Sequence, residues 1–268
     1  MKKIVCLLFI AGFLSVSCSG SDDSNDSGND TKSNYLPMDS GDYWVYDTKS
    51  SASAGRDSLY IANDTVIGKN TYKKFKTKSA PTGFYSGALS NNAIRKTDGK
   101  LLLTGSTAFA FSSDIPIAIA VNDFVFFDTN ATAGTALGAT SGTIGQPVDA
   151  YTANINYKLS AVAGDDIANY TSNGVVYPAV KTVKLTLTLS ITAKAVILGT
   201  TLEATVMKTQ DVLVSTQYYV KNIGAVAVST AINYHLEDLS KLGVTLPIDS
   251  YGSDHQDETL VSYHVKAE

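Results

Sequence analysis

Residues 182–197 alternate apolar and polar side chains, and this run constrains the fold more than any other stretch of the chain. Valine, leucine, isoleucine and alanine fill the odd positions, whereas threonine, serine and lysine fill the even positions as far as Lys194. A period of two is typical of a β-strand with one buried and one solvated face. At about 3.3 Å per residue the run would extend about 50 Å, well beyond a usual strand of about 5–6 residues. A strand of that length has to bend, which predicts a strongly curved sheet.

Most of the remaining chain also has the pattern of β-strands. Residues 152–163 and 224–236 repeat the alternation, and Asp98-Gly99 is a hairpin signal between two short apolar runs. Further strands are predicted at 43–48, 57–62, 71–77, 93–97, 100–104, 123–127, 203–221 and 259–266. The only predicted helix is 236–243, two turns ended by Gly243.

These patterns predict an all-β fold with one strongly curved antiparallel sheet of about ten or eleven strands. A half-barrel around an apolar interior is the preferred arrangement. A closed barrel and a two-sheet β-sandwich satisfy the same pattern.

The N-terminus has the organisation of an export signal. Two lysines precede the apolar run 4–16, which is too short for a membrane span of about 20 residues. The sequence LSVSC, ending at Cys18, resembles the lipobox of bacterial lipoproteins, in which the cysteine is acylated and anchors the protein to the membrane. An ordinary signal peptide with an incidental cysteine is the alternative. We therefore predict a signal peptide at 1–17, acylated Cys18 with a disordered Asp/Ser-rich tether at 18–34, and a single β domain at 35–268.

Charge and cysteine content exclude several classes of function for the mature chain. Without Lys2 and Lys3, 19 basic and 25 acidic residues remain, a net charge of −6. Binding to nucleic acid requires a basic surface, so it is not expected. The predicted domain contains no cysteine, which excludes a disulfide, a thiolate nucleophile and a cysteine-ligated zinc.

Four segments resemble a group of Bacteroidetes outer-membrane lipoproteins of unassigned role. They are YLPMDSGDYWVYD at 35–47 (their PlxxGxyWxY motif), DTVIGKNTYKKFKT at 64–77, QYYVKNIGAVAVS at 217–229 (their yyxkxvGxV hairpin) and ETLVSYHV at 258–265. SGSDD after Cys18 also resembles their acidic export signal. The resemblance implies a lipid-anchored outer-membrane protein, at the cell surface rather than the periplasmic face, with Trp44 and Tyr46 in its core and Gly224 at a turn. It supplies no catalytic residue, and the half-barrel preference rests partly on analogy with lipoprotein carriers.

No motif for catalysis is present. The sequence has no G-x-S-x-G, S-x-x-K, H-E-x-x-H, P-loop or G-x-G-x-x-G pattern. Imidazole and carboxylates crowd together only at 254–258, which is interpreted as a solvated loop before the last strand, with a metal site as the alternative. We therefore expect neither enzymatic activity nor a cofactor or metal.

The middle of the chain is unusual in composition. Residues 101–157 contain no lysine or arginine; 116–127 is strongly apolar, and 129–147 is uncharged and rich in small residues. The second segment is predicted to be either the adaptable rim of a binding cavity or a buried strand with an irregular connection. The residues proposed to line such a cavity are Ile117, Ile119, Phe124, Phe126 and Phe127.

Two short patterns are candidates for modification. Asp57-Ser58-Leu59 and Asp64-Thr65-Val66 resemble the O-glycosylation site of exported Bacteroidetes proteins, which makes Ser58 and Thr65 candidate acceptors.

Three functions remain compatible with the sequence. The preferred one is a non-enzymatic envelope lipoprotein that binds an apolar or glycan-bearing small ligand within the curved sheet. The second is a structural or interaction module that meets another envelope protein through an exposed strand edge. The third is a hydrolase with unrecognised acidic residues. An apolar cavity would favour the first, and a filled core with a bare, uncharged edge strand would favour the second.

Overall fold

The computed structural model describes residues 34–112, 115–148, 151–197, 200–240 and 249–266. These residues form the strands β1 (Tyr43–Lys49), β2 (Ala54–Ile67), β3 (Asn70–Thr77), β4 (Ala93–Thr97), β5 (Lys100–Ser112), β6 (Ile115–Asp128), β7 (Ala136–Val148), β8 (Tyr151–Ala163), β9 (Ile167–Ser172), β10 (Val175–Ile197), β11 (Thr200–Val220), β12 (Gly224–His235) and β13 (Tyr251–His264), with one helix, α1 (Phe84–Asn91).

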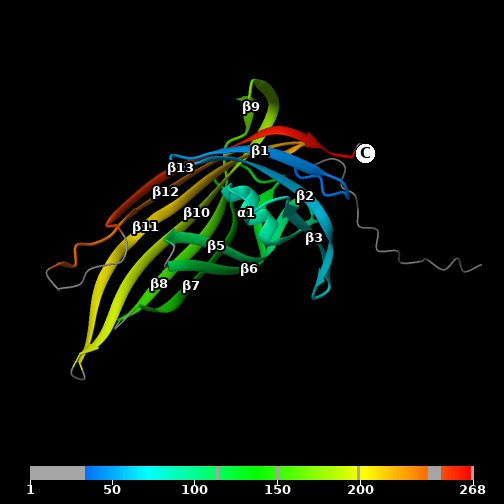
Figure 1. Ribbon diagram of the computed structural model, residues 1–268. Helices are drawn as coiled ribbons and strands as arrows, with labels where there is room; N and C mark the ends of the chain where they lie inside the picture. The colour runs from blue at the N-terminus through cyan, green and yellow to red at the C-terminus, as the bar shows by residue number, and fades with distance from the viewer. Residues whose placement is uncertain (1–33, 113–114, 149–150, 198–199, 241–248, 267–268) are drawn as a thin grey trace, which may run out of the picture.

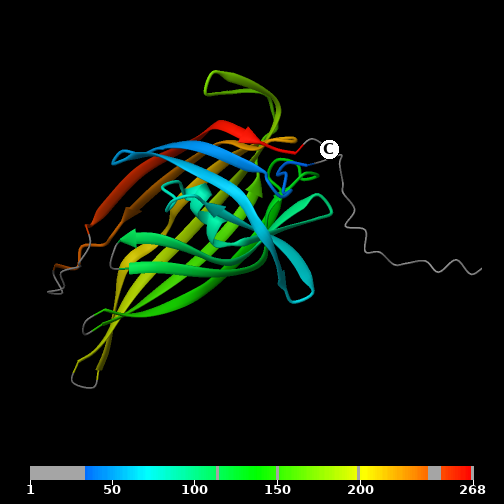
Figure 2. The ribbon, with the colours of Figure 1, turned by 45° about the vertical axis from the view of Figure 1, so that its right-hand side comes forward.

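All strands belong to a single 13-stranded sheet. Its order is β6-β5-β4-β3-β2-β1-β13-β12-β11-β10-β8-β7, with β9 paired to β10 off this path. Every neighbouring pair is antiparallel, and β1 pairs with β13, so the first and last strands lie side by side in the middle of the sheet. The sheet curls until its two edge strands, β6 and β7, approach each other, which gives a nearly closed barrel (Figures 1 and 2). The predicted all-β fold with one strongly curved antiparallel sheet is confirmed, with more strands than expected.

The alternation at 182–197 produces the longest strand, β10, which has 23 residues. Its leucines at 185, 187 and 189 lie buried in the core, whereas the intervening threonines are less buried. Pairing between β10 and β11 shifts register three times, at Leu187/Thr188, Leu189/Ile191 and Ile191/Thr192. Bulges of this kind increase local twist, so they allow two long strands to coil with the sheet (Figure 1).

The helix prediction was wrong in the part of 236–243 that the structure describes. Residues 236–239 are not helical, and residues 241–243 of the predicted helix lie outside the described residues. The helix is instead α1, whose sequence FYSGALSN has serine and glycine at three of eight positions. Both residue types are poor helix formers, so side chains elsewhere in the fold have to stabilise this helix.

The segments that carried the family resemblance pack together. Trp44 and Tyr46 are fully buried, and both reach from β1 to the start of β12. The Trp44 indole Nε1–H donates to the Ile223 carbonyl (2.5 Å), and the Tyr46 hydroxyl donates to the Ala225 carbonyl (2.8 Å). Between them Gly224 has φ +110°, and a side chain there would press on Trp44. No helix within the described ranges is long and apolar enough to cross a membrane.

Candidate functional site

Helix α1 lies on the concave side of the sheet, where it fills much of the barrel interior (Figure 1). Its side chains Tyr85 and Leu89 are buried, 1% and 2% exposed. The concave side of a curved sheet is where a ligand was expected. In this structure a segment of the chain itself occupies that space.

Side chains from β2 and β13 satisfy the N-terminal backbone groups of α1. The N–H groups of Thr82 and Gly83 donate to the Asp57 carboxylate (3.0 and 2.7 Å). The N–H groups of Tyr85 and Ser86 donate to Glu258, and the Ser86 hydroxyl donates to it as well (2.9 Å). The four N–H groups at a helix N-terminus have no partner within the helix, so these carboxylates stabilise α1 in place of a local cap.

Asp57 and Glu258 form a buried acidic pair. Each is 1% exposed, and no described lysine, arginine or histidine forms an ion pair with either. Burial raises the pKa of Glu258 from 4.5 to about 7, although its hydrogen bonds to Tyr85 and Ser86 oppose the shift. Gly83 makes the contact possible, because a side-chain carbon there would overlap the Glu258 carboxylate.

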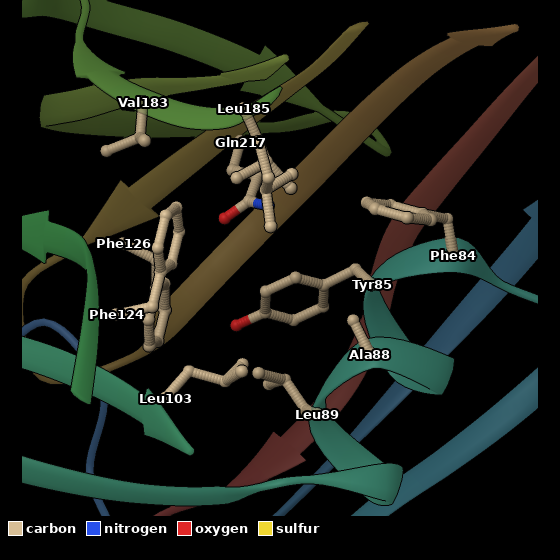
Figure 3. Close-up of a pocket in the computed structure, with 11 residues that line it drawn as sticks. Phe84, Tyr85, Ala88, Leu89, Leu103, Phe124, Phe126, Val183, Leu185 and Gln217 are labelled. Carbon is tan, nitrogen blue, oxygen red and sulfur yellow. The ribbon is translucent and has the colours of Figure 1, made fainter. Parts of the chain in front are cut away.

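A small apolar cavity remains between α1 and the sheet (Figure 3). Its volume is about 30 Å³, room for about two water molecules. Side chains of α1 form one wall and strands β5, β6, β8, β10 and β11 form the others; the lining residues are Phe84, Tyr85, Ala88, Leu89, Leu103, Phe124, Phe126, Leu159, Val183, Leu185 and Gln217. A ligand pocket for a drug-sized molecule has about 300–1,000 Å³, so the interior is nearly filled.

Two polar groups face this cavity. The Tyr85 hydroxyl is buried and forms no hydrogen bond with any described residue. It lies beside Tyr219, whose ring centroid is 6.3 Å from that of Tyr85 and whose hydroxyl donates to the Gln217 carbonyl oxygen (2.7 Å). Burial raises the pKa of Tyr85, so its hydroxyl is protonated and acts as a donor near neutral pH.

The five residues proposed to bind a ligand are all buried, but they do not form one site. Phe124 and Phe126 line the cavity. Ile117 and Ile119 lie in the filled core, 1% and 0% exposed. Phe127 packs against Tyr219 and Tyr35, with ring centroids 4.8 and 5.1 Å apart.

A surface groove of about 500 Å³ lies between β6 and β7. It is lined by 120–125 and 137–140. At its base a side chain on Gly138 would lie 2.5 Å from the Val125 carbonyl oxygen, so glycine permits the two backbones to touch. Asp123 on this wall receives hydrogen bonds from Arg95 (2.7 and 2.9 Å) and from the Tyr72 hydroxyl (2.7 Å), which hold β6 against β3 and β4 and lower the pKa of Asp123.

Strand β7 is an exposed edge strand. The segment 129–147 consists of a connection at 129–135 and most of β7. The alternative of a buried strand with an irregular connection was therefore wrong about burial, because no residue of 136–147 is buried. β7 pairs with β8 along one side, and among the described residues no ladder joins its other side to β6. It contains no Asp, Glu, Lys or Arg.

The residues at 254–258 belong to β13 and not to a loop, which corrects the interpretation from the sequence. Alternation along the strand turns Gln256 and Glu258 toward α1, whereas His255 lies exposed beside Asp257, with Nε2 and Oδ1 3.1 Å apart. Among the described residues, no group of three or more potential metal ligands converges.

The candidate modification sites are accessible in part. Ser58 and Thr65 are both half-buried in β2, and Asp64 before Thr65 pairs with Lys73 (2.7 Å). Cys18 lies outside the described residues.

Sequence reasoning missed Asp57, Tyr85, Gln217 and the inward role of Glu258. The only available signal was the alternation of β13, which separates Glu258 from His255 once 251–264 is assigned to a strand. No protein-family model matches the chain, and neither a curated protein nor a solved structure is significantly similar to it.

Proposed function

We propose that this chain is a non-catalytic interaction module, held to the envelope by acylated Cys18, that binds an extended polypeptide segment along the free edge of β7. The observation that carries the proposal is the uncharged edge strand β7, which contacts the β6 backbone at Gly138 but forms no ladder with β6 among the described residues, beside a groove of about 500 Å³. The nearly filled interior favours this function over the ligand binding preferred from the sequence.

The backbone of β7 supplies the affinity in this proposal. In an edge strand every second residue directs its N–H and C=O away from the paired neighbour. An added strand would satisfy these groups and continue the sheet, the mode known as β-augmentation. Pro147 has no N–H, so it marks the end of the usable edge.

The composition of β7 supports the same function. Proteins usually protect exposed edges with lysine, inward charges or a covering loop, because bare edges associate. Ala139, Ser141 and Thr143 are exposed and small, so they present neither charge nor bulk to an incoming strand. The neighbouring wall of the groove, β6, exposes Ala118, Ala120 and Asn122.

Site-specific photo-crosslinking in the cells that produce the protein tests this function. A photoreactive amino acid is placed at Ser141 on β7 and, as the matched control, at exposed Thr71 on β3. We expect a discrete adduct from position 141 only, mapping by mass spectrometry to one short segment of a partner. Thr143→Lys in the same chain should abolish it. Equal adducts from both positions, or none from position 141, would refute the proposal.

A further inference from the structure

The cavity beneath α1 contains one buried hydrogen-bond donor without an acceptor among the described residues. The Tyr85 hydroxyl points into the cavity, toward Phe124, and is buried without a partner (Figure 3). The Gln217 side chain lines the same cavity, and its carbonyl oxygen accepts a hydrogen bond from the Tyr219 hydroxyl (2.7 Å). Leaving a buried donor unsatisfied is costly, so an acceptor is expected in this space.

The charge of the surroundings restricts what that acceptor can be. None of the lining residues is cationic, so a carboxylate or phosphate would be buried without a counter-charge. Glu258 also lies close enough to Tyr85 to act on it electrostatically. A neutral acceptor, such as the carbonyl oxygen of a ketone, ester or amide, avoids both penalties.

We propose that the cavity beneath α1 is a binding site for a small neutral molecule with an apolar body and one carbonyl-type acceptor. The acceptor receives hydrogen bonds from the Tyr85 hydroxyl and the Gln217 amide. The apolar body packs against Leu103, Phe124, Phe126 and the leucine and valine side chains of β8 and β10. This site is separate from the edge of β7.

The volume of the cavity determines how such a molecule enters. About 30 Å³ is room for about two water molecules, so the cavity as it stands accommodates only the carbonyl group of such a molecule. The strand walls are fixed by continuous ladders, whereas α1 is eight residues long and is attached at its N-terminus through side chains. A longer molecule therefore requires α1 to move outward. The affinity for the ligand should decrease once its carbon chain is longer than that movement allows.

The test uses methyl ketones from acetone to 2-octanone with a ¹³C-labelled carbonyl, titrated into the full chain. Binding is measured by NMR and the hydrogen bond by the infrared carbonyl stretch. We expect saturable binding with a shift of the stretch to lower frequency. Tyr85→Phe should weaken binding about fivefold and reduce the shift, since it removes one donor.

Two further variants separate this site from general effects on the core. Tyr46→Phe alters another buried tyrosine, whose hydroxyl is satisfied by the Ala225 carbonyl, and should leave ketone affinity unchanged. Ala88→Leu fills the cavity from α1 and should abolish binding while the circular dichroism spectrum is retained. No binding by the wild-type chain, or equal affinity and frequency in Tyr85→Phe, would show that the cavity holds only water. Either result leaves the crosslinking test at β7 unaffected.

Discussion

Glu258 should make this protein less stable as pH rises from 4.5 to about 7, which is opposite to the effect of most carboxylates in folded proteins. The carboxyl is 1% exposed, and burial raises its pKa from 4.5 to about 7. Between these two values the folded state holds a proton that the unfolded state has released. Stability is therefore lost as pH rises through this window, and the loss is complete above about pH 7. Each tenfold change in proton affinity is worth about 1.4 kcal/mol, so the total loss is about 3 kcal/mol.

Urea denaturation at several pH values from 4.5 to 8 measures this effect. Trp44 is the only tryptophan and is fully buried, so its fluorescence reports unfolding. We expect the free energy of unfolding of the wild-type chain to decrease by about 3 kcal/mol relative to Glu258→Gln between pH 4.5 and 8. Glu203→Gln, which alters an exposed carboxylate paired with Lys194, is the control and should behave like the wild type.

The opposite outcome has a clear physical meaning. If the difference between wild type and Glu258→Gln does not change with pH, or changes so that wild type gains stability toward pH 8, the carboxylate is ionised in the folded state. The N–H groups of α1 and the positive end of its dipole would then outweigh burial. That result would refute the reasoning given for the acidic pair.

Three further predictions concern other parts of the molecule. Gly138→Val should lower the free energy of unfolding by about 1–3 kcal/mol and increase hydrogen exchange in β6, because the new side chain would overlap the Val125 backbone. Unchanged stability and exchange would show that the edge strands β6 and β7 move apart freely. Gly224→Ala should lower the free energy of unfolding, measured by urea denaturation, by about 1–3 kcal/mol, since φ is +110° there and Trp44 Nε1 would lie 3.1 Å from the added carbon. Gly68→Ala is the control, because the added carbon has open space there. A loss for Gly224→Ala no larger than that for Gly68→Ala would contradict this prediction. Cys18→Ser should move the protein from the membrane fraction to the soluble fraction and abolish incorporation of labelled palmitate; membrane retention of the variant would exclude acylation as the anchor.

The strands could be predicted from the sequence because their signal is local. In β10 and β8 burial follows the alternation, so the pattern predicts both the strand and its inward face. In β12 residues 224–228 are all buried, so alternation predicts the strand but not its inward face. β7 lacks this signal, since glycine, alanine and threonine distinguish poorly between an inward and an outward face. Its edge position follows from the order of the strands, which no local pattern contains.

The candidate sites could not be predicted because they depend on distant segments. The sequence of α1 is a weak helix former, and its partners Asp57 and Glu258 lie more than 20 and more than 170 residues away from it. Phe124 and Phe126 were correctly placed in the apolar interior, but only the fold shows that Tyr85 from α1 occupies the space in front of them. The sequence therefore predicted an apolar concave surface without indicating that the chain would fill it.

Pairing of β1 with β13 has a consequence for how the chain acquires its structure. Tyr43 pairs with His264, and the Lys266 N–H donates to Asp42 (2.8 Å), so contacts at the centre of the sheet join residues more than 200 positions apart. β13 is synthesised after the other twelve strands of the sheet, and until then β1 and β12 have no shared neighbour and Glu258 is not available to α1. Contacts at such large sequence separation form slowly. The sheet therefore remains incomplete until β13 is available, and loss of β13 should prevent the barrel from forming at all.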